Sequence, residues 1–382
     1  MQTAKKTIQL HIDKAKVIAF VKKNAVLMVA LVAALVTSFI IPPDSAYLKY
    51  FDWKTLTCLF CVLATVCAFK NIRFFSVLAE KIVTLFKNTR ASVLALAYIT
   101  FLGSMLIAND MALLTFLPLG YFVLSSTGKE KYMAFTFIIQ NIAANLGGML
   151  TPFGNPQNLY LYTKFNIPTG EFVATMLPPF AISVALITVC CLLFVKKETL
   201  IIEREQVSLP KWRTMIYALL FTLSIVIVFR VIPFVVGLII IPISLLILDR
   251  KALKDVDYGL LFTFAAFFVF SGNMARMEAV RSLFAGLLEK NTLLVSALSC
   301  QVISNVPSAI LLSQFTENYT SLLLGVNIGG VGTLISSLAS LITFREYISH
   351  NPKGMKKYVL LFSAFNFGFL FLLLGVQSLI LL

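Results

Sequence analysis

Four short polar segments interrupt long apolar stretches of the sequence, and they contain the residue types that bind small ions. They are Ala108-Asn109-Asp110, residues 151–158 (TPFGNPQN), residues 304–307 (SNVP) and residues 332–337 (GTLISS). A helix that breaks in an apolar environment leaves backbone N–H and C=O groups unsatisfied, which is costly unless a site uses them. Carbonyl, amide and hydroxyl oxygens suit Na+, whereas free backbone amides suit an anion. The breaks therefore predict a site for a small ion.

The candidate ligands are residues of these breaks. Those expected to bind substrate or ion are Asn109, Asp110, Thr151, Gly154, Asn155, Asn158, Ser304, Asn305, Thr333, Ser336 and Ser337, of which Asn109, Asp110, Asn155 and Asn305 are the candidate Na+ ligands. Asp110 is the one acidic residue at a predicted break, and no Lys or Arg lies at one. It is either an ion ligand or proton carrier, or only a cap of the following helix. Asn155 before Pro156, and Asn305 two residues before Pro307, are typical of helix N-caps.

The elements that carry these breaks are predicted to be membrane helices. The chain of 382 residues is 59% hydrophobic and 13% charged, with a mean hydropathy of +0.90, so lipid rather than water must surround most of it. The predicted crossings are 25–41, 55–69, 132–165 (interrupted), 172–195, 212–230, 233–248, 258–271, 320–345 (interrupted) and 357–380. Residues 91–125 and 291–317 are split by polar tips into arms that look too short to cross, so each predicts a re-entrant hairpin. Amphipathic segments precede them at about 72–88 and 273–290.

The distribution of basic residues predicts the orientation. With the N-terminus inside, 25 Lys and Arg residues fall on the cytoplasmic side and 7 on the other. This bias explains the net charge of +15 without a nucleic-acid partner. The expected location is the cell membrane, with residues 196–210 as a cytoplasmic linker and no cleaved signal.

The two halves of the chain share a pattern. Residues 147–155 align with 329–337 at an offset of 182, and Ala108-Asn109 aligns with Ser304-Asn305 at an offset of 196. An odd number of crossings separates equivalent points, so the halves should be inverted repeats. The predicted organisation is a basic segment (1–24), a first repeat (25–195), a linker with one crossing (196–232) and a second repeat (233–382). The fold class is an all-α polytopic membrane protein, in which each repeat holds one hairpin and one broken helix.

Other polar residues support no enzyme or cofactor site. Neither the six cysteines, all in apolar runs, nor the two histidines indicate a disulfide framework or zinc. An intramembrane hydrolase would need a paired nucleophile and base or a second membrane aspartate, and a P-loop is missing. Gln140, Asn141 and Asn145 either face the ion site or bond between helices. Tyr160 and Tyr162 are expected at the membrane interface.

At the breaks the chain resembles the ion transporter superfamily of divalent-anion/Na+ symporters, citrate carriers, arsenite permeases and certain Na+/H+ antiporters. The matching segments are 104–120 (SMLIANDMALLTFLPLG), 151–162 (TPFGNPQNLYLY), the ISNVPSAILL segment and 332–341 (GTLISSLASL). The resemblance implies Na+ and substrate at the tips and unwound loops, a homodimer, and elevator movement of one domain. In two departures, Asp110 and Val306 replace threonines of the carboxylate branch, and the second unwound region lacks Asn-Pro.

These features predict an ion-coupled secondary transporter, driven by Na+ or H+, for a small anion such as a di- or tricarboxylate or an oxyanion. The alternative is a Na+/H+ antiporter on the same scaffold, with Asp110 exchanging the two cations. A channel is a further rival, which single-channel conductance would reveal. No cofactor beyond the coupling ion is expected, and the expected partners are the lipid bilayer and a second copy of the chain.

Overall fold

The computed structural model describes residues 24–200 and 209–381, so most of the basic segment 1–24 and part of the linker 196–210 lie outside the described residues. Within these ranges the regular secondary structure is helical apart from one isolated β-bridge, between Asn88 and Thr199. Eight helices of the described chain are long and apolar enough to cross a membrane. The prediction of an all-α polytopic membrane protein is confirmed.

The helices follow the predicted order of spans. The first half holds α2 (Ala25–Ile40), α3 (Trp53–Asn71), α4 (Phe74–Val83), α5 (Thr89–Ile107), α6 (Asn109–Ser126), α7 (Met133–Gly147), α8 (Pro156–Lys164) and α9 (Thr169–Phe194). After α10 (Lys211–Val228) come α11 (Phe234–Leu248), α12 (Arg250–Lys254), α13 (Tyr258–Ala275), α14 (Glu278–Ile303), α15 (Asn305–Leu312), α16 (Tyr319–Ile328), α17 (Leu338–His350) and α18 (Met355–Ile380).

The backbone breaks where the polar segments predict. Helix α5 ends before Ala108 and α6 begins after it, and Ser304 separates α14 from α15 in the same way. The two interrupted spans become α7 and α8, and α16 and α17, each pair joined by a loop rich in glycine and hydroxyl residues. All four breaks are therefore present.

The expectation that every hairpin arm is too short to cross is wrong. Helix α5 has 19 residues and α6 has 18. Helix α5 begins before residue 91 because Asn88 caps it by accepting the backbone N–H of Ala91 (3.0 Å). Helix α15, with 8 residues, is as short as predicted. Helix α14 joins an amphipathic piece to a hairpin arm across the non-helical Asn291 (φ −164°, ψ 90°). That kink lies at the predicted start of the hairpin.

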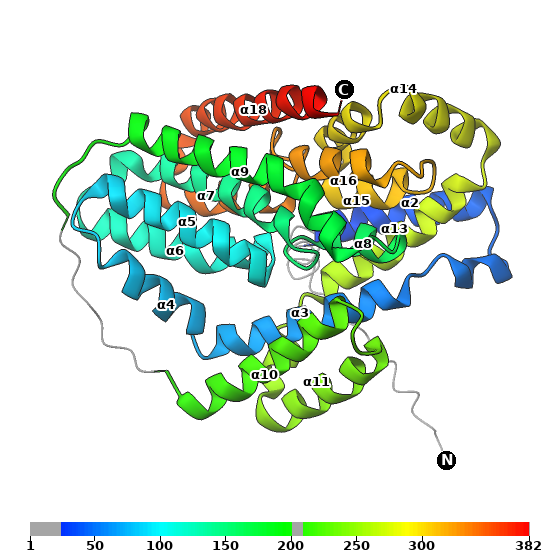
Figure 1. The fold of residues 1–382 in the computed structure, drawn as a ribbon, viewed down its shortest axis with the longest axis horizontal. Helices are drawn as coiled ribbons and strands as arrows, with labels where there is room; N and C mark the ends of the chain where they lie inside the picture. The colour runs from blue at the N-terminus through cyan, green and yellow to red at the C-terminus, as the bar shows by residue number, and fades with distance from the viewer. Residues whose placement is uncertain (1–23, 201–208, 382) are drawn as a thin grey trace, which may run out of the picture.

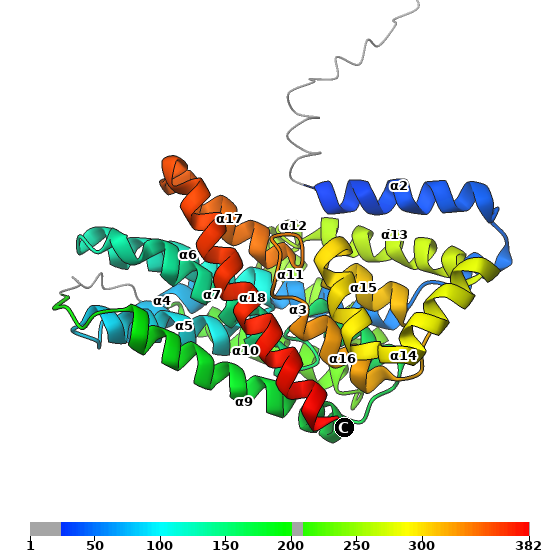
Figure 2. The ribbon, with the colours of Figure 1, turned by 90° about the horizontal axis from the view of Figure 1, so that it is seen from above.

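The helices pack around α7, nearly all of whose residues are buried. It contacts α5, α6, α9, α17 and α18, and Figure 1 shows this group on one side, with α13 to α16 on the other and α3, α10 and α11 below. Figure 2 shows α18 running across the group and α2 at an outer edge, where it packs on α13. Large apolar side chains are exposed on α2, α9, α10, α11 and α18, which suits a lipid environment.

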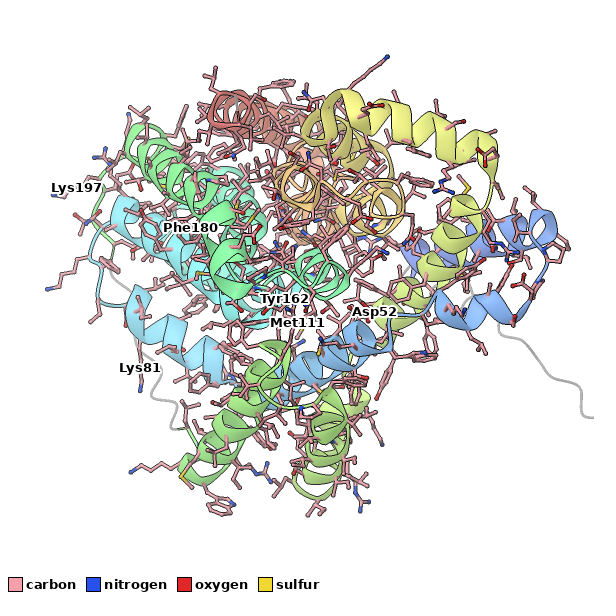
Figure 3. The ribbon with its side chains drawn as sticks, turned by 45° about the vertical axis from the view of Figure 1, so that its right-hand side comes forward. Asp52, Lys81, Met111, Tyr162, Phe180 and Lys197 are labelled. Carbon is pink, nitrogen blue, oxygen red and sulfur yellow. The ribbon has the colours of Figure 1, made fainter. Side chains whose placement is uncertain are left out.

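Charged and aromatic residues differ in their placement. Lys81 and Lys197, both predicted to be cytoplasmic, lie at one edge of the molecule, and Asp52 lies away from that edge (Figure 3).

Tyr160 and Tyr162 were expected at the membrane interface, and this is wrong: they are 2% and 1% exposed. Their hydroxyl groups bond to Ser313 (2.8 Å) and Thr169 (2.7 Å), which satisfies them inside the protein.

Candidate functional site

The two hairpin tips have the same backbone conformation. Ala108 has φ 64° and ψ 152°, and Ser304 has φ 73° and ψ 160°. Non-glycine residues rarely adopt positive φ, and such strain is concentrated at functional sites. At both tips the next residue is an asparagine whose Oδ1 accepts the following backbone N–H at 2.9 Å, from Asp110 and from Val306.

Asn305 is therefore not the N-cap that the sequence suggested. It is the first residue of α15, and Ser304 occupies the N-cap position. The chain turns at Ser304, which has positive φ, so α15 begins at Asn305 and not after it, as the position of Pro307 had indicated. Its side chain still bonds the start of the helix, so the polar contact is shifted rather than lost.

Each unwound loop is tied to its hairpin by the same bond. The Thr151 hydroxyl donates to the carbonyl of Met105 (2.7 Å), and the Thr333 hydroxyl donates to the carbonyl of Gln301 (3.1 Å). Met105 and Gln301 both lie three residues before a tip. These two threonines act on the backbone of the hairpins, where they satisfy carbonyls near the helix ends.

A chain of buried amides connects the two loops. The Asn155 Nδ2 donates to the carbonyl of Asn145 and to Asn327 Oδ1, both at 3.2 Å, and Asn327 Nδ2 donates to Asn158 Oδ1 at 2.6 Å. Asn109 Nδ2 donates to Asn145 Oδ1 at 3.3 Å, which brings the first tip into the network. Asn155 occupies the predicted N-cap position of α8, but its side chain makes no capping bond: its Nδ2 is used in this network and its Oδ1 has no partner.

Asn327 is a site residue that the sequence reasoning missed. It lies 182 residues after Asn145, the offset that relates the two glycine-rich loops, and both asparagines are buried. Extending the alignment two residues toward the N-terminus would have found it. Gln140 and Asn141 bond instead between helices, to Thr100 (3.1 Å) and to Asn366 (3.3 Å).

The remaining break residues hold the loops in shape. Asn158 Nδ2 donates to the carbonyls of Gly148 and Met149, and the Ser336 hydroxyl donates to that of Gly330. A methyl group at Gly154 would lie 2.4 Å from the Gly148 carbonyl oxygen, so the loop closes only on a residue without a side chain. Ser337 caps α17 by accepting the backbone N–H of Ser340 (3.2 Å).

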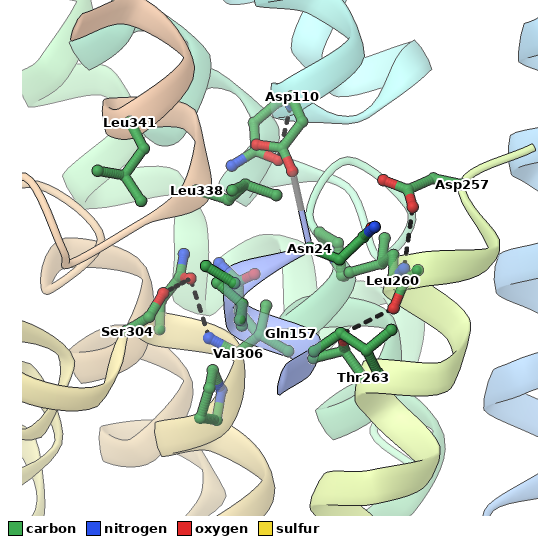
Figure 4. A pocket seen from close by; sticks show the side chains of 18 of the residues that line it. Asn24, Asp110, Gln157, Asp257, Leu260, Thr263, Ser304, Val306, Leu338 and Leu341 are labelled. Atoms are coloured by element: carbon green, nitrogen blue, oxygen red, sulfur yellow. Dashed lines mark hydrogen bonds between the residues drawn. The ribbon is translucent and has the colours of Figure 1, made fainter. Parts of the chain in front are cut away.

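Both tips line one cavity of about 100 Å³. Of the predicted residues, Asn109, Asp110, Ser304 and Asn305 line it (Figure 4). Those that do not are Thr151, Gly154, Asn155, Asn158, Thr333, Ser336 and Ser337. The structure thus separates a layer in contact with the cavity from a layer that supports it.

The cavity also holds charges that the sequence did not point to. Asp257 caps α13 through the N–H of Leu260 (3.0 Å) and lines the same cavity as Asp110 (Figure 4). Arg345 lines it as well, so a basic residue shares the cavity with Asp110 although none lies at a break. Leu338, Leu341 and Arg345 follow one another at helical spacing on α17, which carries the arginine from the break to the cavity.

Several buried oxygens around the tips lack a donor. Among the described residues, Asp110 Oδ1, Asn155 Oδ1 and Gln157 Oε1 have no hydrogen-bond partner, and Gln157 lines the cavity. Buried acceptors are rarely left unpaired without a reason. Amide and carboxylate oxygens without donors are the ligands that a small cation binds.

The sequence is similar to that of a known family and to those of two known proteins. Residues 16–320 match the citrate transporter family. The "Uncharacterized transporter MJ0456" of Methanocaldococcus jannaschii is 35% identical over 296 residues, which cover 77% of this chain and 81% of that protein. The "Inner membrane protein YbiR" of Escherichia coli is 29% identical over 316 residues, 81% of this chain and 84% of that protein. The chain therefore belongs to the citrate transporter family and is a multi-pass membrane transporter.

Proposed function

We propose that the protein is an ion-coupled secondary transporter of a small anion, a di- or tricarboxylate such as citrate or an oxyanion such as arsenite. The observation that carries the proposal is the convergence of both helix tips on one cavity that contains Asp110 and Gln157, each with an unpaired side-chain oxygen. Such oxygens suit the coupling cation, Na+ or H+, and the positive dipole ends of the helices that start after the breaks suit the anion. The family matched by the chain supports citrate as the first substrate to test.

The proposed mechanism is alternating access by two inverted repeats, of the elevator type. The matching tip conformations and the matching threonine bonds support a common ancestry of the halves. The repeats remain assigned to residues 25–195 and 233–382, and the functional unit is proposed to be a homodimer, as the superfamily resemblance implies.

The charge balance explains why a cation should accompany the anion. Asp110 and Asp257 both line the cavity with Arg345, so an anionic substrate meets two carboxylates there. A carboxylate repels an anion unless a proton or metal cation neutralises it. Binding of Na+ or H+ at Asp110 would remove this repulsion and couple the two fluxes.

The second candidate is a Na+/H+ antiporter. It is favoured by the unpartnered Oδ1 of Asp110, because a carboxylate without a donor can alternate between a proton and a cation. In that case the cavity would carry no anion at all.

Counterflow in proteoliposomes separates the two functions. Vesicles loaded with unlabelled citrate should accumulate labelled citrate if the protein carries it, with succinate and arsenite tested in parallel. An antiporter should give no anion counterflow and should show Na+ flux linked to pH. Absence of both fluxes from folded, reconstituted protein would contradict both candidates.

The proposed orientation places the N-terminus in the cytoplasm. In a cysteine-free background, Lys197→Cys should label only from the cytoplasmic face and Lys164→Cys only from the other. The reason is that Lys197 follows α9 and Lys164 precedes it, so one crossing separates them. Labelling of both from one face would overturn the inverted-repeat topology.

A further inference from the structure

A second cavity, of about 410 Å³, lies at the other end of the helices that line the first one. Helix α8 places Pro156 and Gln157 in the first cavity and Lys164 in the second. Helix α13 does the same with Thr263 and Phe268. At a rise of about 1.5 Å per residue, Gln157 and Lys164 are roughly 10 Å apart along the helix.

Tyr160 closes the space between the two cavities on α8. It is 2% exposed, its hydroxyl bonds to Ser313 (2.8 Å), and it accepts a bond from Gln314 Nε2 (3.4 Å). Its ring lies 5.6 Å from that of Phe268, centre to centre. The second cavity is therefore a separate chamber, which the packing of α8, α13 and α15 divides from the ion-binding one.

The second cavity is positively charged. Lys49, Lys54 and Lys164 line it, and none of them forms an ion pair with a described residue. The one carboxylate on its wall, Asp52, is occupied by Thr55, whose N–H and hydroxyl donate to it at 2.9 and 2.6 Å. The lining of this cavity thus contains three lysines and one aspartate, and the aspartate already caps α3.

We propose that this cavity captures a free multivalent anion, of the carboxylate class, at the face of the protein opposite the ion-binding cavity. A cleft lined by one sign of charge between low-dielectric walls concentrates counter-ions and raises their association rate. Its role in loading substrate rests on the proposed function, whereas anion binding by the lysines does not. The three lysines are on the side that the charge bias predicts to be extracytoplasmic.

Trp53 provides a reporter for this charge. Its ring stacks on Phe51, which lines the cavity, with 5.3 Å between the centroids, and it is 59% exposed. The sequence contains only one other tryptophan, Trp212, so Trp212→Phe leaves Trp53 as the single emitter. Fluorescence quenching by the anion iodide, relative to neutral acrylamide, then measures the local potential.

The experiment uses the full chain in vesicles of neutral phosphatidylcholine. We expect the combined variant Lys49→Gln, Lys54→Gln, Lys164→Gln to lower the iodide-to-acrylamide quenching ratio by about two-fold or more, and citrate to reduce iodide quenching of the protein with all three lysines. The matched control, Lys251→Gln, Lys254→Gln, Lys353→Gln, removes the same charge elsewhere and should leave the ratio unchanged. An unchanged ratio in the first variant, or no effect of citrate, would overturn the proposal. Displacement of iodide by added phosphatidylglycerol, without displacement by citrate, would also overturn the proposal, because the cavity would then bind a lipid headgroup.

Transport measurements distinguish this proposal from the proposed function. If both hold, the first lysine variant should raise the KM for citrate several-fold at low salt with little change in kcat. Asn109→Ala should reduce transport strongly and leave iodide quenching intact. Citrate that displaces iodide but is never transported would contradict citrate transport alone, and citrate transport with unaltered quenching would contradict the capture site alone.

Discussion

Asp110→Asn is expected to leave measurable anion uptake but to raise the cation concentration needed for half-maximal uptake by ten-fold or more. A unit charge pair about 4 Å apart contributes roughly 4 kcal/mol at an effective dielectric constant of about 20, and about 1.4 kcal/mol corresponds to ten-fold in affinity. In an antiporter the same variant should abolish exchange and its pH dependence together, because the carboxylate itself carries the cation. The measurement is uptake by proteoliposomes as a function of Na+ concentration and pH.

Asp257→Asn is the matched control for this substitution. Asp257 lines the same cavity, but its Oδ1 caps α13, a role that asparagine fulfils equally well. It should therefore alter cation dependence much less than Asp110→Asn. Normal rate, pH profile and cation dependence in Asp110→Asn would leave that residue with only a structural role at the start of α6 and would remove the main support for the antiporter.

Asn109→Ala and Asn305→Ala should each reduce transport strongly while the protein remains folded and inserted. Both side chains line the cavity, and the Oδ1 of each bonds the start of a helix. Losing such a bond costs about 1 kcal/mol, which a polytopic protein tolerates. Losing an oxygen from the cavity removes a ligand directly. Initial uptake rates at matched protein levels provide the measurement.

Asn318→Ala is the control for lost capping. Asn318 accepts the N–H of Ser321 (3.1 Å) at the start of α16 and does not line the cavity. It should cost similar stability and leave transport near the wild-type rate. Wild-type transport in both Asn109→Ala and Asn305→Ala would mean that the ion binds elsewhere.

The breaks were predictable from the sequence because their causes are local. Asn155 before Pro156 and the repeated glycine-rich loops favour a break in a helix, and the structure breaks there. The positions of the two hairpin tips were also predictable, because Ala108-Asn109 aligns with Ser304-Asn305 at an offset of 196. Arm length was less predictable, since Asn88 extends α5 by a cap that hydropathy does not detect.

The composition of the cavity was not predictable in the same way. Asp257 and Arg345 stand at the ends of predicted crossings, but packing of α13 and α17 brings them to the cavity that Asp110 lines. Asn155 and Asn158 were both candidate ion ligands, yet the Oδ1 of Asn158 accepts a bond from Asn327 and its Nδ2 donates to loop carbonyls, whereas the Oδ1 of Asn155 has no partner. Which oxygens remain unpaired depends on contacts between segments far apart in the chain, and a local pattern does not contain them.

Modification of a cysteine between the tips tests the ion-binding cavity most directly. Val306 lines it and replaces a threonine of the carboxylate branch. The Val306→Cys variant in a cysteine-free background, once shown to transport, should react with a maleimide more slowly in Na+ plus citrate than in choline, whereas a cysteine at Lys197 should react at the same rate in both solutions. If H+ is the coupling ion, low pH should slow the reaction at Val306→Cys more than the reaction at Lys197→Cys, because protonation of the thiol itself slows both. Rates at Val306→Cys that change no more than those at Lys197→Cys under all these conditions, in protein that transports, would contradict an ion-binding site between the two tips.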